Sequence, residues 1–192
     1  MIYKFMEKLT LEKHLEILCN EEKDYEILHS IWSLNKTNLS KGLKLIPSIY
    51  PNYSVHDETH SNKIIDSIEL LLGEERIEKL SPTDTFLILM ACYTHDIGMI
   101  LTYKVIEKKW QDNKMKSTIN SFTQSQDKVI ADAANLILSF QKADQKNSKK
   151  TDKDNLQWAL KVKNAVTILT AELFRSDHAQ MSSTYMTENE EF

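Results

Sequence analysis

The sequence predicts an all-α fold, a bundle of helices, and three observations support this prediction. The 192 residues include only three glycines and three prolines, so few positions favour tight turns. Leucine, isoleucine, lysine and glutamate, which helices accommodate readily, are abundant. Apolar residues recur three and four positions apart in several segments, which is the spacing of one helix face.

Two helices are expected before residue 35. Thr10 can cap the first of them, whose inward face carries leucines at helical spacing: Leu11, Leu15 and Leu18. The second runs from about Glu22 to Leu34 and turns three large residues inward: Tyr25, Leu28 and Trp32. Residues 35–53 contain a glycine and two prolines, and they predict a connection with one short helical turn.

A third helix is expected between Val55 and Leu72. Its apolar residues recur at helical spacing: Ile64, Ile65, Ile68, Leu71 and Leu72. Gly73 marks its end, because glycine readily adopts the left-handed conformation that closes many helices.

A fourth helix begins at Ser81 and is expected to be the central buried element. Serine caps a helix, Pro82 fits the first helical position, and Asp84 lies near the positive end of the helix dipole. From Phe86 to Tyr93 the helix is apolar on every side, which predicts burial all round. Gly98 marks its end through the same left-handed conformation.

The second half of the chain predicts three further helices. They cover Tyr103 to about Met115, Asp127 to Gln141, and Leu156 to Phe174. Between the last two, residues 142–155 are rich in Lys, Asp and Asn and lack an apolar anchor, so we expect a mobile loop. Residues 187–192 are acidic and predict a frayed tail.

Charge and cysteine content narrow the class of protein. The net charge of −4 gives no general basic field for extended duplex nucleic acid, although a small phosphorylated ligand could be bound by local charges. Cys19 and Cys92 lack zinc-type spacing, which suits a reducing compartment. The first residues lack the apolar core of a signal peptide, and the apolar run ending at Tyr93 is too short to span a bilayer. We therefore expect a soluble, cytoplasmic protein without a membrane partner.

The adjacent pair His95-Asp96 is the first candidate for chemistry. It offers an imidazole nitrogen and a carboxylate oxygen, a ligand set that borderline divalent metals favour. Neighbouring residues diverge by about 100° around a helix. Both side chains can therefore hold one ion only if it lies between them, most easily at a helix end.

A second candidate is the segment His56-Asp57-Glu58-Thr59-His60. Two histidines four positions apart share a helix face, which is the spacing of the zinc proteases. The protease pattern fails, because Asp57 stands where glutamate is required and Thr59 breaks the inverted form. His60 remains a metal-ligand candidate at the start of a helix. His56 is either an ordinary helix-start residue or one that faces a substrate.

A third candidate follows the last long helix as Arg175-Ser176-Asp177-His178. A guanidinium group binds phosphate oxygens in a bidentate manner, and a histidine can bind a metal. Alone, this cluster would be an ordinary solvated helix end.

Taken together, His60, the pair His95-Asp96 and His178 resemble the HD-domain superfamily of metal-dependent phosphohydrolases. The closer similarity is to the HD domains of bacterial conflict-type proteins, in which an Hsp90-like GHKL ATPase domain commonly follows. It rests on residues 53–61 and 91–99 and on Arg175 with His178. The resemblance implies an HD-domain-like bundle over residues 54–186. Residues 1–53 would form a helical extension that packs on this core.

The resemblance also implies roles for individual residues. The metal ligands would be His60, His95, Asp96 and His178, for a divalent ion of Mn, Fe, Ni, Zn or Mg. Asp96 and His178 would be catalytic, and Arg175 and His56 would bind the substrate. A counterpart of the family's terminal aspartate is missing from the sequence. We therefore expect this chain to be the N-terminal part of a longer protein, with a GHKL-type ATPase domain downstream.

The function implied is hydrolysis of a nucleotide or a related small phosphoester by water that a bound metal activates. Two alternatives stay open. One is a catalytically weak sensor or interaction module that binds metal or nucleotide and is coupled to the downstream ATPase domain, which the missing aspartate favours. The other is a structural helical domain in which His95 and Asp96 form a buried hydrogen-bonded pair.

Overall fold

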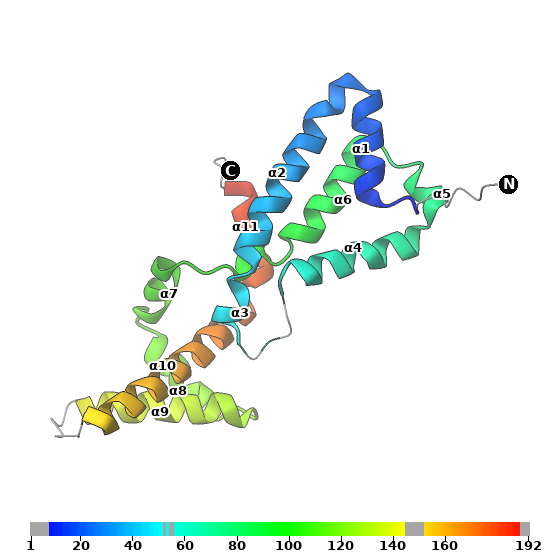
Figure 1. The fold of residues 1–192 in the computed structure, drawn as a ribbon. Coiled ribbons are helices and arrows are strands. Elements are labelled where there is room, and N and C mark those ends of the chain that lie inside the picture. The colour runs from blue at the N-terminus through cyan, green and yellow to red at the C-terminus, as the bar shows by residue number, and fades with distance from the viewer. Residues whose placement is uncertain (1–7, 52, 54–55, 145–151, 189–192) are drawn as a thin grey trace. The chain divides into compact units, whose positions relative to one another are not determined.

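The computed structural model describes residues 8–51, 53, 56–144 and 152–188, and every regular element in them is a helix (Figure 1). The predicted all-α class is therefore confirmed. The chain divides into two compact units, each assembled from separated segments. The first comprises Met1–Leu45, Val55–Gly98 and Ala179–Phe192, and the second Ile46–Ser54 and Met99–His178. This division does not test the predicted boundary at residue 53, which stays a prediction.

The first unit is organised around one helix. Its helices are α1 (Leu11–Glu21), η1 (Lys23–Tyr25), α2 (Glu26–Leu43), α4 (Glu58–Leu72), α5 (Glu74–Ile77), α6 (Pro82–Thr94), most of the 3-10 helix η2 (Ile97–Met99) and most of α11 (His178–Glu188). Helices α1, α2 and α4 all contact α6 (Figure 1). The side chains buried among them are mainly apolar, including Leu11, Leu15, Trp32, Leu43 and Leu89.

Helix α2 shows that burial overrides local turn signals. It begins at Glu26 and continues to Leu43, so the predicted connection is wrong for residues 35–43. Leu39 and Leu43 are buried and continue the inward face that Trp32 begins. The single glycine in this stretch, Gly42, costs about 1 kcal/mol in a helix, which this burial outweighs. The short helical turn expected in this region is present as α3 (Ile46–Ile49).

The ends of α1, α4 and α6 follow local signals. The Thr10 hydroxyl accepts the backbone N–H of Lys13, as a helix cap does. Ser81 and Asp84 cap α6 reciprocally, each side chain accepting the other's backbone N–H. Gly73 ends α4 at a φ of 70°. The prediction that Gly98 ends α6 in the left-handed conformation is wrong. Among the described glycines only Gly73 has a positive φ, and α6 already ends at Thr94.

Two predictions about burial are wrong in detail. Leu87 on α6 is 57% exposed and Leu71 on α4 is 78% exposed. Helix α4 instead buries Ser61, Ile65 and Glu69, which lie four residues apart on one face. When a helix is apolar on several sides, its sequence does not show which face will contact a neighbouring helix. The buried face is therefore decided by tertiary packing.

A buried carboxylate connects α4 to the start of α1. Glu69 accepts the backbone N–H of Leu11 at 2.9 Å, and Lys8 Nζ lies 3.7 Å from the other oxygen. Leu11 is the first residue of α1, where backbone N–H groups lack an acceptor within the helix. Glu69 supplies that acceptor and places negative charge at the positive end of the helix dipole.

The substitution Glu69→Ala is expected to lower the free energy of unfolding by about 1–3 kcal/mol, because it leaves a buried N–H group without an acceptor. Urea denaturation followed by circular dichroism measures this change. Asp66→Ala, at an exposed position of the same helix, is the matched control and should stay within about 0.5 kcal/mol of wild type. Equal losses in the two variants would contradict the proposed cap.

The second unit contains α3, α7 (Tyr103–Trp110), α8 (Met115–Phe122), α9 (Lys128–Asp144) and α10 (Asp152–Arg175). Helix α9 packs against both α8 and α10, and α10 also contacts α3. The buried residues include Met115, Ile119, Ala134, Ile137 and Leu169.

Several boundaries in the second half differ from the prediction. Helix α7 ends at Trp110, and a turn separates it from α8. The predicted loop at 142–155 is wrong at both ends, since α9 reaches Asp144 and α10 begins at Asp152; residues 145–151 lie outside the described residues. Helix α11 was not expected after His178. It includes residues 187 and 188 of the predicted tail, whose remainder also lies outside.

Within the described residues, no single helix is both long and apolar enough to cross a membrane. The two parts Pro82–Met99 and Tyr103–Trp110 reach that length and hydropathy only as a bent pair.

Candidate metal centre

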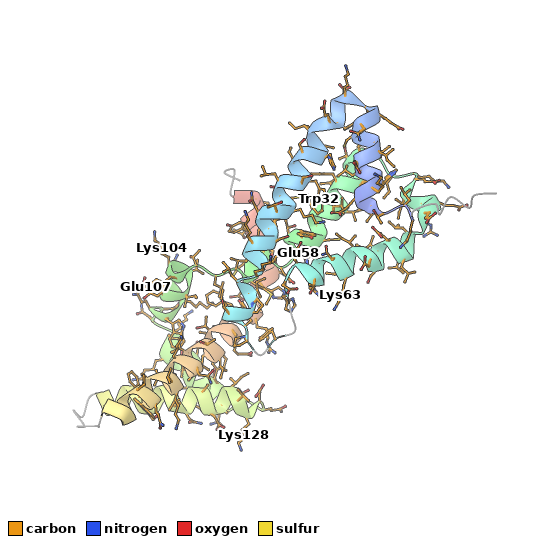
Figure 2. All side chains as sticks on the ribbon, viewed as in Figure 1. Trp32, Glu58, Lys63, Lys104, Glu107 and Lys128 are labelled. Carbon is orange, nitrogen blue, oxygen red and sulfur yellow. The ribbon has the colours of Figure 1, made fainter. Side chains whose placement is uncertain are left out.

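The ends of two helices in the first unit carry the candidate ligands. His56 precedes α4, and His60 lies in its first turn. Asp57 begins this helix as its cap, because its carboxylate accepts the backbone N–H of Thr59 at 2.9 Å. His95 follows the last residue of α6, and Asp96 is next in the chain. Helices α4 and α6 are in contact, with Glu58 labelled in the first turn of α4 (Figure 2).

One oxygen of Asp96 is the centre of the cluster. Oδ2 lies 2.7 Å from His56 Nδ1, 2.9 Å from His95 Nε2 and 3.8 Å from His60 Nε2. Asp96 is only 4% exposed, whereas the three histidine rings remain partly open to solvent. The site therefore combines a buried carboxylate with accessible imidazoles.

The surroundings shift the pKa of each of three groups for a different reason. Burial of Asp96 alone would raise its pKa, but hydrogen bonds from His95 and His56 outweigh burial and lower it to about 2. The hydrogen bond to Asp96 raises the pKa of His95. Burial lowers the pKa of His60, although the Asp96 charge opposes this. The carboxylate is thus ionised at neutral pH, as a metal ligand must be.

The backbone orients the His95 ring. Its Nδ1–H donates to the carbonyl of Cys92 at 3.0 Å, which turns Nε2 toward Asp96. Metal-binding histidines commonly donate their other ring nitrogen to a backbone carbonyl in this way. While Nε2–H also donates to Asp96, both nitrogens carry protons, which agrees with the raised pKa of His95. Metal binding at Nε2 would release that proton.

The donor set fits a divalent metal. Ligand atoms of His56, His60 and Asp96 all lie within 4.8 Å of one another. Two imidazole nitrogens and one carboxylate oxygen suit borderline ions such as Zn²⁺, Fe²⁺, Mn²⁺ or Ni²⁺. The sequence had placed His56 toward the substrate, whereas the structure places its ring among the ligand atoms. The individual roles of these residues stay predictions.

A side-chain hydrogen bond joins α4 to α6 near the cluster. Tyr93 donates its hydroxyl to Asn62 Oδ1 at 2.8 Å, joining the two helices close to His60 and His95. Burial raises the pKa of Tyr93 to about 12, so its hydroxyl remains a donor. Sequence reasoning missed Asn62, because a single asparagine on a helix carries no local signal of its partner.

Comparison with known protein families identifies the type of domain. A family model described as HD-CE matches residues 50–191, which is most of the chain. The chain belongs to the HD-CE family. The match identifies an HD-type domain and spans all the candidate site residues, from His56 to His178. No significant match was found among curated proteins or solved structures.

The remaining site residues predicted for this HD-CE domain, Arg175 and His178, belong to the second unit. The exposed Arg175 pairs with Glu172 at 3.1 Å, and His178 Nδ1–H donates to the Arg175 carbonyl at 2.8 Å. Arg175 lines two cavities in this unit. One, of about 420 Å³, is lined by both basic and acidic side chains, including Lys109, Lys114, Asp112 and Asp177. The other, of about 400 Å³, is lined by Tyr53, Ile130 and Ile168 and by the acidic residues Asp127 and Glu172.

The metal-free HD-CE protein is expected to lose stability as the pH falls from about 4 to 2. Asp96 has a pKa of about 2 in the fold against an ordinary 3.8, so its ionised form stabilises the fold above about pH 4. That contribution, about 2 kcal/mol, is lost as the folded carboxyl group becomes protonated. Urea denaturation over this pH range, with chelator present, measures it. The stability difference between wild type and Asp96→Asn should shrink toward pH 2, and a constant difference would contradict the assignment.

Proposed function

We propose that this HD-CE protein is a metal-dependent phosphohydrolase that acts in the cytoplasm on a nucleotide or a related small phosphoester. The cluster of His56, His60, His95 and Asp96 is the observation that carries the proposal. Membership of an HD-type family supports it. The net charge of −4 favours a small ligand over extended duplex nucleic acid, and local cations would bind its phosphate.

The cluster would hold the metal through His60, Asp96 and the other histidines. A bound divalent metal lowers the pKa of a coordinated water and neutralises charge on phosphoryl oxygens. Asp96 would orient that water, since its buried carboxylate has a fixed position between His56 and His95. His95 would bind through Nε2, with its ring held by the Cys92 carbonyl.

Arg175 and His178 belong to the second unit, and the roles proposed for them rest on the resemblance to the family pattern. The Arg175 guanidinium would bind non-bridging phosphate oxygens after leaving Glu172. The 420 Å³ cavity that it lines also contains Lys114, Lys109 paired with Asp177 at 3.2 Å, and the carboxylate of Asp112. A cavity of about 420 Å³ lies within the range of small-molecule sites. His178 would serve as the further histidine near a metal or the substrate phosphate.

Phosphate release from a panel of nucleotides and a generic aryl phosphate, with Mn²⁺ or Ni²⁺ added, tests the proposal. We expect release that requires the metal and that falls roughly 100-fold or more in His60→Ala, because a ligand is lost. His29→Ala, a histidine on α2 outside the cluster, should keep wild-type activity. Metal-loaded wild type that releases no phosphate from any substrate would contradict hydrolase function.

A second function, a catalytically weak sensor of metal or nucleotide, is favoured by the hydrogen bonds from His56 and His95 to Asp96. These bonds satisfy the buried carboxylate before a metal binds, so reversible occupancy would leave the fold intact. Binding of Mn²⁺ and nucleotide without phosphate release supports this function. In either case we propose coupling to a GHKL-type ATPase domain downstream. In a protein that carries both domains, a change in ATPase rate on adding metal would support that coupling.

A further inference from the structure

A buried serine far along the chain contacts the turn that carries His95 and Asp96. Ser182 lies in α11 and is 6% exposed. Its hydroxyl donates to the backbone carbonyl of His95 at 2.8 Å and accepts the backbone N–H of Gly98 at 2.8 Å. One side chain, 87 and 84 positions from its two partners, therefore bridges both ends of residues 95–98, a turn that continues into the 3-10 helix η2 and is named here the 95–98 turn.

Both backbone groups depend on a partner from outside α6. The carbonyl of His95 lies at the end of that helix, where the last carbonyls have no intrahelical donor. The N–H of Gly98 is buried, and leaving it unpaired would be costly. A hydroxyl can donate once and accept as well, so a serine here satisfies both groups at once.

The two residues that Ser182 binds lie on either side of Asp96 in the sequence, and Asp96 is the central residue of the cluster. Asp96 lies between His95 and Gly98, and its Oδ2 is within 3.0 Å of ring nitrogens of both His56 and His95. A ligand set must be held within about 0.5 Å of its productive geometry. Releasing either end of the turn would let the Asp96 carboxylate and the His95 ring move relative to α4.

We propose that Ser182 is a positioning residue of the metal centre, which fixes the 95–98 turn and thereby places Asp96 and His95 for a divalent cation. The inference rests on the proposed function for the presence of the metal. It adds a residue from α11 that never touches the ion.

The test compares Mn²⁺ affinity of wild type and Ser182→Ala by isothermal titration calorimetry. We expect the variant to bind roughly 10- to 100-fold more weakly, as loss of a supporting hydrogen bond commonly does. Hydrogen exchange of the backbone amides in residues 95–98 should also become faster in the metal-free variant. Ser183→Ala, on the exposed side of the same helix, is the matched control and should change neither measurement.

A second control separates positioning from general destabilisation. Ile77→Val removes one methyl group from a fully buried residue of the same unit, lowers stability, and should keep wild-type Mn²⁺ affinity. If Ser182→Ala does not fold, Ser182→Cys retains a weaker donor and acceptor and should bind with intermediate affinity.

The outcomes distinguish this inference from the proposed function. A folded Ser182→Ala or Ser182→Cys protein that binds Mn²⁺ as tightly as wild type overturns the positioning role alone. Wild type that binds Mn²⁺ but releases no phosphate contradicts the hydrolase, while weaker binding in the variant still supports Ser182. Absence of Mn²⁺ binding by wild type overturns both.

Discussion

Replacing Asp96 with asparagine is expected to weaken divalent metal binding by roughly 100-fold or more. The Oδ2 atom of Asp96 is the common neighbour of His56, His60 and His95, so its charge is central to the ligand set. Asparagine keeps the size of the side chain but offers a neutral oxygen, which binds such ions less well than a carboxylate. Isothermal titration calorimetry with Mn²⁺ and Ni²⁺ measures the loss.

Thermal unfolding gives an independent readout of the same effect. A ligand that binds only the folded protein stabilises it by mass action, by about 2.7 kcal/mol at 100 times its dissociation constant. The wild-type Tm should therefore rise on adding Mn²⁺, and that of Asp96→Asn should not. Asp66→Asn, at an exposed position of α4, should respond like wild type. Equal metal-induced shifts in all three proteins would show that the ion binds elsewhere.

The substitution Trp32→Ala is expected to lower the free energy of unfolding by about 3–5 kcal/mol. Trp32, labelled on α2 in Figure 2, is 2% exposed and packs edge-to-face on Tyr93 of α6 at a ring separation of 5.2 Å. Its Nε1–H also donates to Glu12 of α1 at 3.1 Å. One side chain therefore joins three helices, and urea denaturation measures the cost of removing it.

Two related variants separate packing from hydrogen bonding. Trp32→Phe keeps an aromatic ring against Tyr93 but loses the donor to Glu12, so its loss should be smaller than that of Trp32→Ala. Leu34→Ala, at an exposed position of the same helix, should stay within about 0.5 kcal/mol of wild type. A loss below about 1 kcal/mol in Trp32→Ala would contradict its place in the core.

Local signals predicted the helices most reliably where the signal and its partner are close in sequence. The cap at Thr10, the reciprocal cap of Ser81 with Asp84 and the left-handed Gly73 are contacts or conformations within a few residues. Where distant burial competes, local signals failed. Helix α2 continues through Gly42 because Leu39 and Leu43 are buried, and Gly98 lies in the short 3-10 helix η2, where Ser182 accepts its backbone N–H.

The residues of the candidate site also fall into those that the sequence predicted and those that only the structure showed. Residue chemistry alone singled out His60, His95 and Asp96, because histidine and aspartate are among the side chains that ligate such metals. It did not place His56 beside Asp96, since that contact exists only once α4 meets α6. The sequence did not predict the roles of Asn62 and Ser182, because serine and asparagine are common on helices and their hydrogen-bond partners lie far away in the sequence.

The sequence by itself therefore determined the all-α class, the helix caps and the kind of chemistry available. Only the tertiary structure decided that one oxygen of Asp96 meets histidines from both helices, and that Ser182 holds the turn behind it. The physical reason is the range of each interaction. Helix propensity and capping act between residues one to four positions apart, whereas the contacts from Asp96 to His56 and from Ser182 to His95 join residues 40 and 87 positions apart.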